Sequence, residues 1–270
     1  MRIDPVEAAL PAGGVDSHAH LDMETFNSRR DEVIRLAKKC GVSQIGNVFL
    51  SPSDYRNNKK YFRDEPGIFF LLGMHPSDGM KCTPECLSQI EEAFQQDPRL
   101  AAVGEIGLDY YWDDCPRELQ REIFVLQLEM ARKLDKPVVI HCRDAAEDCL
   151  AFLEAGGFKD YPLLWHCFGG DRELAKRIVD NGWHISIPGS ITYKANNAAR
   201  EAVAIIPDDK LLLETDSPYL SPVPWRGTPN QPAYIVFTAR EVARIRNIEP
   251  NDLWQLCGEN ARRFFSLDHN

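Results

Sequence analysis

Short apolar segments alternate with amphipathic ones along nearly the whole chain, and this alternation limits the possible folds more than any other feature. Eight of the segments have the length and the apolar, often β-branched composition of strands, at 14–20, 44–50, 68–75, 101–108, 138–142, 163–168, 183–188 and 211–216. Stretches with helical spacing lie between them, for example at 29–40, 116–134 and 172–181. Strands that alternate with helices predict a parallel sheet with crossover helices. We expect an α/β protein with a (β/α)₈ TIM barrel, and an open doubly wound sheet is the alternative.

Proline and glycine mark the ends of the predicted helices. Thr83-Pro84 can begin a helix that ends before Asp97-Pro98, and Asn181-Gly182 can end the helix that precedes the seventh strand. Two amphipathic segments, at 233–246 and 251–265, complete the outer layer, and 217–232 remains a long loop after the last strand. Because the pattern contains no interdomain linker, we expect one hydrolase domain over residues 1–270.

Charge, hydropathy and cysteine usage exclude several classes of protein. With 31 Lys and Arg against 41 Asp and Glu, the net charge of −10 argues against binding nucleic acid through bulk surface charge, so a polyanion needs a local basic site or bound cations. No apolar run approaches the roughly 18 residues that span a bilayer, and no signal peptide is recognisable. We therefore expect a cytoplasmic protein without membrane contact, and a monomer. The eight cysteines form no Cys-x-x-Cys pair and are expected to be reduced, although Cys82 and Cys86 have a spacing that can hold a metal on one helix turn.

Side chains that bind metals recur at the C-terminal ends of the predicted strands. His18 and His20 end the first strand, and because alternate residues of a strand share a face, their imidazoles point into the same space. Four later strands end on, or shortly after, similar residues: Glu105, His141, His166 and Asp216. The active site of a TIM barrel lies at this rim. A single histidine at a strand end is more often a packed residue than a ligand, but the six residues together predict a metal site.

Six ligands exceed the roughly three or four protein groups that one catalytic ion takes, so we predict two ions. We assign the first to the opening histidine pair with Asp216 and the second to His141 and His166, with Glu105 as the bridge. Four imidazoles and two carboxylates suit Zn²⁺, Mn²⁺, Co²⁺ or Ni²⁺ better than Mg²⁺ alone. Such a pair of ions, roughly 3.5–4 Å apart, can lower the pKa of a shared water and bind the oxygens of a phosphoryl centre.

Five sequence motifs contain these six residues. They are Val-Asp-Ser-His-Ala-His-Leu-Asp at 15–22, Val-Gly-Glu-Ile-Gly-Leu-Asp-Tyr at 103–110, Pro-Val-Val-Ile-His-Cys-Arg-Asp-Ala at 137–145, His-Cys-Phe-Gly-Gly at 166–170 and Leu-Leu-Leu-Glu-Thr-Asp-Ser-Pro-Tyr-Leu at 211–220. In this order they resemble the TatD family of metal-dependent deoxyribonucleases, and the element Arg-Gly-Thr-Pro-Asn-Gln-Pro at 226–232 is similar to the family's Arg-Gly-x-x-Asn-x-Pro.

The resemblance implies a TIM barrel of the amidohydrolase superfamily, the same six ligands, and hydrolysis of DNA phosphodiester bonds, often from 3′ to 5′. We predict catalytic roles for Glu105 and Asp216, with Asp216 taking a proton from the attacking water. A net-negative protein with a narrow metal-filled cleft suits the end of a single strand better than a duplex. Family members often carry Ser where Gly169 stands and a basic residue where Thr228 stands, which leaves the details of the substrate open.

The phosphate groups of such a substrate need donors besides the ions. Arg143, just past a predicted ligand, and Arg226, in the long last loop, are the candidates because a guanidinium offers a forked donor. His75 either contacts a phosphate at the rim or supports its loop. Glu214, Asp109 and Asp144 are candidates for orienting a ligand histidine. Five aromatic residues flank the site in sequence and could stack on unpaired bases, although for any single one local packing is the better explanation: Tyr110, Tyr111, Trp112, Tyr219 and Trp225.

Two other classes of function remain open. One is a metal hydrolase of the same superfamily that acts on a small molecule such as a lactone, amide or phosphotriester, or on D-aminoacyl-tRNA as implied by a few relatives that resemble this family. The other is a binding or scaffold protein that keeps the barrel without its activity, and the complete set of ligands counts against it. Assays with end-labelled DNA and variants of the predicted ligands distinguish these possibilities.

Overall fold

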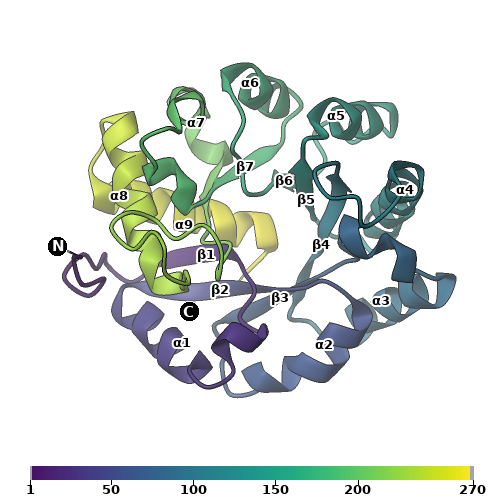
Figure 1. Ribbon diagram of the computed structural model, residues 1–270, viewed down its shortest axis with the longest axis horizontal. Helices are drawn as coiled ribbons and strands as arrows, with labels where there is room; N and C mark the ends of the chain where they lie inside the picture. Colours follow the sequence, from purple (N-terminus) through teal and green to yellow (C-terminus); the bar gives the residue numbers. More distant parts are fainter. Residues whose placement is uncertain (1, 268–270) are drawn as a thin grey trace.

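The computed structural model describes residues 2–267, which form eight parallel strands surrounded by helices, viewed along the barrel in Figure 1. The strands are β1 (Gly14–Ala19), β2 (Val42–Phe49), β3 (Ile68–Leu72), β4 (Leu100–Asp109), β5 (Val138–Arg143), β6 (Leu163–Trp165), β7 (His184–Ile187) and β8 (Leu211–Leu213). They pair in sequence order, and a bridge between Ala19 and Ser217 brings the last strand back to the first. This nearly closed barrel confirms the predicted TIM-barrel fold and excludes a doubly wound sheet, whose strand order is not sequential.

The helices lie outside the barrel between successive strands. They are α1 (Arg30–Lys39), α2 (Pro52–Asn58), α3 (Pro84–Gln96), α4 (Arg117–Lys133), α5 (Ala146–Ala155), α6 (Arg172–Asp180), α7 (Asn197–Val203), α8 (Ile235–Arg246) and α9 (Pro250–Phe265). Six short 3₁₀ turns join them in the described residues: η1 (Glu24–Phe26), η2 (Lys59–Phe62), η3 (Pro76–Lys81), η4 (Gly189–Thr192), η5 (Asp208–Lys210) and η6 (Pro232–Tyr234). Thr83 caps α3 by accepting a hydrogen bond from the backbone N–H of Cys86, so the predicted start of this helix is confirmed.

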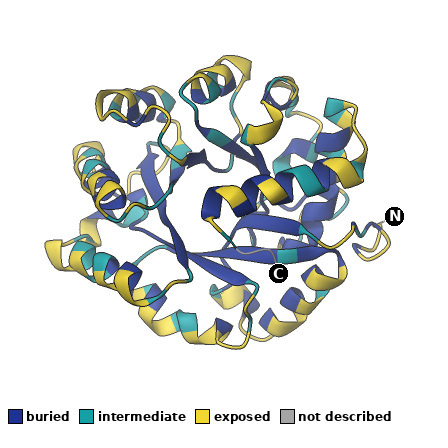
Figure 2. Ribbon diagram, turned by 180° about the vertical axis from the view of Figure 1, so that it is seen from behind, coloured by how far each residue is buried: buried dark blue, intermediate teal, exposed yellow. Residues whose placement is uncertain are grey.

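Helix α9 closes the N-terminal end of the barrel. Figure 2, seen from behind, shows it lying across that end, and more than half of its residues are buried. Phe264 and Phe265 join one apolar cluster with the inward residues of the strands, and the Phe265 ring lies 4.8 Å from that of Phe69. Gly14 lies so close to Trp254 that a Cβ there would come within 1.7 Å of the indole. Because packing fills this end, the opposite end is the one that can hold a site.

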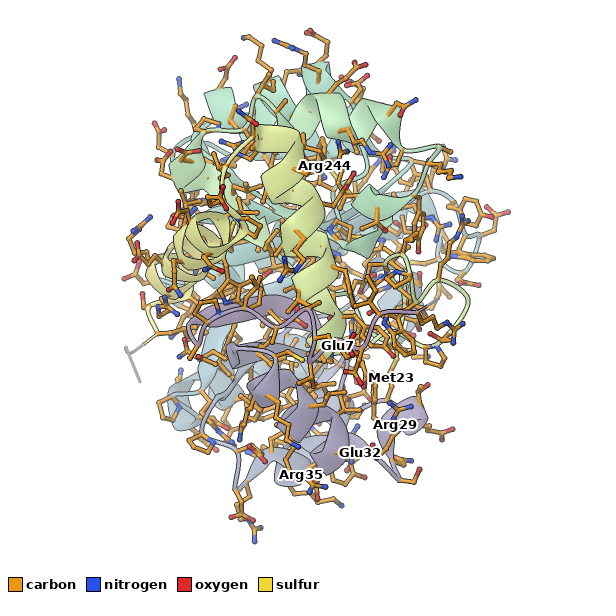
Figure 3. The ribbon with its side chains drawn as sticks, turned by 90° about the vertical axis from the view of Figure 1, so that its left-hand side faces the viewer. Glu7, Met23, Arg29, Glu32, Arg35 and Arg244 are labelled. Carbon is orange, nitrogen blue, oxygen red and sulfur yellow. The ribbon has the colours of Figure 1, made fainter. Side chains whose placement is uncertain are left out.

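The segment ahead of β1 runs along the outside of the barrel. Figure 3 shows it, at Glu7, passing between α8, which carries Arg244, and α1. Arg240 donates to the carbonyl oxygen of Ala8 at 3.1 Å, and the indole of Trp254 donates to that of Pro11 at 2.7 Å. These contacts attach the segment to the last two helices.

Three predicted strands end three residues earlier than expected. The segments 68–75, 163–168 and 211–216 form strands only as far as Leu72, Trp165 and Leu213. The backbone turns left-handed just beyond the last two, at Cys167 (φ 51°) and Asp216 (φ 53°), and this conformation cannot continue an extended ladder. The histidines and carboxylates predicted to end these strands therefore lie in the loops that follow them.

The described helices include none that is long and apolar enough to cross a membrane. All eight cysteines are free thiols, as expected. Within residues 2–267, Cys82 and Cys86 belong to no group of three converging metal-type ligands, and the Cys86 thiol instead accepts a hydrogen bond from Thr83 at 3.3 Å. That the whole chain 1–270 is one hydrolase domain remains a prediction.

His184 lies at the start of β7, at the end of the barrel away from the candidate site, with its ring 5.1 Å from that of Phe264. Burial lowers the pKa of His184 to about 4. In the unfolded chain His184 takes up a proton near the usual histidine pKa of about 6.5. The folded protein is therefore destabilised as the pH drops from about 6.5 to about 4. We expect the wild type to lose on the order of 2 kcal/mol relative to His184→Gln over that window. Urea unfolding of both proteins at several pH values measures this, and identical pH dependences would contradict it.

Candidate metal centre

The six predicted ligands come together at the C-terminal end of the barrel. β1 carries His18 and positions His20 just beyond its end, and β4 and β5 carry the ligands of the middle of the chain. The loops after β6 and β8 supply His166 and Asp216. Four of the six side chains are buried, and His141 and Asp216 are partly exposed. The prediction that residues far apart in sequence share one site is therefore met by their positions, while their role as ligands remains a prediction.

One group consists of His18, His20 and Asp216. Their ligand atoms lie close together: the two Nε2 atoms are 3.3 Å apart, and Asp216 Oδ1 is 3.4 Å from His20 Nε2 and 4.0 Å from His18 Nε2. Two nitrogens that bind one tetrahedral ion at about 2.0–2.1 Å are themselves separated by roughly 3.4 Å. The spacing of this group therefore fits a shared cation.

Glu105 lies between this group and the remaining histidines. Its Oε1 is 3.7 Å from His18 Nε2 and 3.5 Å from His20 Nε2. Its Oε2 is 3.1 Å from His141 Nδ1 and 2.7 Å from His166 Nε2. Each carboxylate oxygen thus faces a different pair of imidazoles, which is the arrangement that a bridging ligand needs.

Two further carboxylates lie against the second pair of imidazoles, and the one beside His141 is hydrogen-bonded to it. Asp109 Oδ2 lies 2.9 Å from His141 Nε2, and Glu214 Oε1 lies 3.6 Å from His166 Nδ1. Glu214 is itself fixed by the backbone N–H of Cys167 at 2.6 Å and by the hydroxyl of Ser186 at 2.5 Å. The other ring nitrogen of each imidazole faces Glu105. Carboxylates commonly occupy this position beside metal-binding histidines.

Of the three carboxylates that the sequence suggested for this task, Asp109 is hydrogen-bonded to His141, and Glu214 lies beside His166 at 3.6 Å. Asp144 does not, because it lies exposed with a left-handed backbone (φ 53°).

Sequence reasoning missed Asp16, which fixes the geometry between the first strand and the last loop. This fully buried carboxylate accepts hydrogen bonds from the backbone N–H of Thr215 at 2.8 Å and from its hydroxyl at 2.6 Å. It thereby positions Asp216 against the opening histidines. The alternation of residues in β1 could have identified Asp16. It lies two residues before His18, so the two side chains share the inward face of the strand.

The carboxylates make this centre attractive to positive charge. Burial by itself would raise the pKa of Glu105, but the charges of His166 and His18 outweigh it and hold the pKa well below its usual value. Burial would likewise lower the pKa of His141, and the hydrogen bonds to Asp109 and Glu105 instead raise it to about 9. The carboxylates thus favour a proton on His141, and a divalent cation would satisfy the same lone pairs in place of protons. The residues present therefore fit a metal centre.

His75 supports its loop, as one of the two roles considered for it requires, and its ring also faces the site. Its Nδ1 accepts a hydrogen bond from the backbone N–H of Ser77 at 3.1 Å, which supports the loop, while its Nε2 faces the site, 3.3 Å from His141 Nδ1. Burial, together with the charge of His141, lowers the pKa of His75 to about 4, so this imidazole is neutral. Contact with substrate remains a prediction.

The two predicted phosphate-binding arginines lie at the surface rather than in the cluster. The guanidinium carbon of Arg143 is 3.8 Å from the centre of the Tyr111 ring, and that of Arg226 is 4.3 Å from the centre of the Tyr193 ring. Among the described residues neither forms an ion pair with a carboxylate. Their donors therefore remain available to an anionic substrate.

Local packing explains two of the aromatic residues near the site. The Tyr110 hydroxyl donates to Asp148 at 2.6 Å, and the Trp225 ring stacks on Tyr234 with 4.8 Å between ring centres.

Replacing Asp109 by Asn should weaken metal binding and activity roughly 10- to 100-fold, because the amide no longer holds His141 with a charged acceptor. Zn²⁺ titration against a competing chelator and cleavage kinetics measure both effects. Asp180→Asn, an exposed substitution on α6, is the matched control. Unchanged Zn²⁺ affinity in Asp109→Asn would show that Asp109 does not orient a ligand.

A parallel barrel whose strand ends gather four imidazoles and two carboxylates at one rim defines the class of metal-dependent hydrolases. The family model of TatD related DNases matches residues 15–266. The chain belongs to this family.

Individual relatives align with this chain over nearly its whole length. It is similar to the uncharacterized metal-dependent hydrolase YabD of Bacillus subtilis, with 34% identity over 253 residues that cover 94% of this chain and 99% of that protein. It is 31% identical over 258 residues to the 3′-5′ ssDNA/RNA exonuclease TatD of Erwinia billingiae, covering 93% and 98% of the two chains. The crystal structure of YJJV, a TatD homolog from Escherichia coli, superposes with a TM-score of 0.89 at 27% identity, covering 95% of this chain and 99% of that one.

Proposed function

We propose that the chain hydrolyses phosphodiester bonds of single-stranded DNA from the 3′ end and that it uses two divalent ions. The first would be held by His18, His20 and Asp216, and the second by His141 and His166. The division of the Glu105 oxygens between these two sets carries the proposal, since Oε1 faces one set and Oε2 the other. The exonuclease name of the Erwinia billingiae relative supports the choice of substrate.

Each side chain of the centre has its own role in the proposed hydrolysis. Ions bound at this centre would supply a water of lowered pKa and neutralise charge on the phosphate oxygens. The carboxylate of Asp216, whose Oδ1 faces the two opening histidines, accepts the proton of the attacking water. Asp109 and Glu214 keep their imidazoles turned inward, and Asp16 holds the loop that carries Asp216 in place.

The surroundings of the centre suit a phosphate chain. Arg143 and Arg226 present guanidinium groups at the rim without a carboxylate partner in the described residues, and such groups form forked hydrogen bonds to phosphate. On a chain with a net charge of −10, these local donors and the bound cations would supply the attraction that the overall surface lacks.

Digestion of single-stranded DNA labelled at one end tests the proposal directly. The purified chain is supplied with Mg²⁺, Mn²⁺ or Zn²⁺ and given oligonucleotides that are free at both ends, blocked at the 3′ end or blocked at the 5′ end. We expect cleavage that a 3′ block stops and a 5′ block does not, and that is slower on the matching duplex. Absence of cleavage with every ion, together with hydrolysis of a lactone, amide or D-aminoacyl-tRNA, would overturn it.

A further inference from the structure

Exposed aromatic side chains gather at the end of the barrel that carries the candidate metal ligands. Four aromatic side chains of the described residues are more than a third exposed. Three belong to loops that follow β4 and β8 at this end: Tyr111 (51%), Trp112 (52%) and Tyr219 (52%). The fourth, Tyr61 (39%), lies in η2, where the guanidinium carbon of Arg30 is 4.1 Å from the centre of its ring. Apolar surface left in water beside a site commonly marks a binding surface.

Tyr111 and Trp112 form a pair with a fixed geometry. Their ring centres are 4.7 Å apart with the planes at 87°. The guanidinium carbon of Arg143 lies 3.8 Å from the centre of the Tyr111 ring and 5.7 Å from that of the Trp112 ring. Both backbone N–H groups donate to Oδ1 of Asp109, at 3.0 Å from Tyr111 and 3.3 Å from Trp112. One carboxylate oxygen therefore holds the backbone of both aromatic residues in place.

The same residues tie the aromatic pair to the candidate metal centre. The other oxygen of Asp109 lies 2.9 Å from His141 Nε2. The buried side chain of Gln120 joins the two ends of the loop 109–115. It accepts a hydrogen bond from the Asp109 N–H at 2.8 Å and donates to the carbonyl oxygens of Asp109 at 2.8 Å and Cys115 at 3.0 Å. The pair thus stands at a fixed position beside the second group of histidines, with about half of each side chain in solvent.

We propose that Tyr111 and Trp112 form a stacking platform for unpaired nucleobases beside the hydrolysed phosphodiester, with Arg143 contacting a neighbouring phosphate. The inference rests on the proposed nuclease function and adds a source of affinity to it, because bases that stack need no basic protein surface. Stacking accepts every base, since each has an aromatic face. Bases within a duplex have both faces covered by their neighbours, so the platform favours single strands over duplexes.

Binding and cleavage of two oligonucleotides test the platform. One is single-stranded oligo(dT), and the other has the same backbone with abasic sites at the 3′-terminal nucleotides. In Trp112→Ala and Tyr111→Ala we expect KM for oligo(dT) to rise about tenfold with kcat within a factor of about two, as loss of one stacked base predicts. The abasic strand should bind the wild type and these variants equally. Trp112→Phe should restore most of the affinity, because a phenyl ring still stacks.

The controls separate this inference from the nuclease proposal. Ile248→Ala removes an exposed apolar side chain between α8 and α9, outside the aromatic pair, and should leave KM unchanged. Dissociation constants measured by fluorescence anisotropy in Asp216→Asn with Mn²⁺ report base-dependent binding while cleavage is too slow to consume the strand. Equal affinity of Asp216→Asn and Asp216→Asn/Trp112→Ala for oligo(dT), or an equal loss on the abasic strand, would overturn the platform. A wild type that binds oligo(dT) through its bases but cleaves no DNA would instead overturn the nuclease function.

Discussion

Replacing Glu105 by Gln should lower kcat/KM for single-stranded DNA by at least about 1,000-fold, which corresponds to about 4 kcal/mol of transition-state stabilisation. Gln keeps the shape of the side chain but loses the charge that faces two pairs of imidazoles at once. Its amide group would also turn donors toward nitrogens that need a cation. We therefore expect weaker binding of both ions, so that the metal content falls below one ion per chain after dialysis.

Elemental analysis and cleavage kinetics of the same preparation measure both effects. Circular dichroism and the melting temperature verify that Glu105→Gln has folded. Glu129→Gln is the matched control, because Glu129 lies exposed on α4. Full metal content with activity within tenfold of the wild type would show that Glu105 does not bridge two ions.

Asp216→Asn is the second change with a large expected effect, a fall in kcat of at least about 1,000-fold with little change in KM for DNA. The amide can neither take up the proton of the attacking water nor supply negative charge beside His18 and His20. Asn is the suitable substitution because residue 216 has a left-handed backbone (φ 53°), which Asn tolerates far better than Ala. The metal content should fall by about one ion rather than two, since His141, His166 and Glu105 remain.

Asp135→Asn is a close control for this variant, because Asp135 is exposed and also left-handed, with φ 51°. It should match the wild type in kcat, metal content and melting temperature. If Asp216→Asn kept more than about a tenth of the wild-type kcat, the assignment of the proton acceptor would be wrong.

The fold and most of the site could be predicted because they depend on local patterns. Periodicity identified the strands and most of the helices, and their strict alternation implied the barrel. Alternation within β1 placed His18 and His20 on one face, and the shared rim of parallel strands brought the other ligands to them. The shortened strands β3, β6 and β8 were predicted wrongly because apolar residues continue past the point where the backbone turns, as at Cys167. That turn depends on contacts with distant segments, which no local pattern records.

The sequence by itself determined the alternation of strands and helices and which metal-binding side chains stand at the strand ends, because both follow from repeats of two and 3.6 residues along the chain. Only the tertiary structure decided that the two oxygens of Glu105 face different imidazole pairs, and that Asp109 and Glu214 rather than Asp144 lie beside histidines. It also separated the packed Tyr110 from the exposed Tyr111. These properties depend on side-chain directions and on loop turns fixed by packing between segments far apart in the chain.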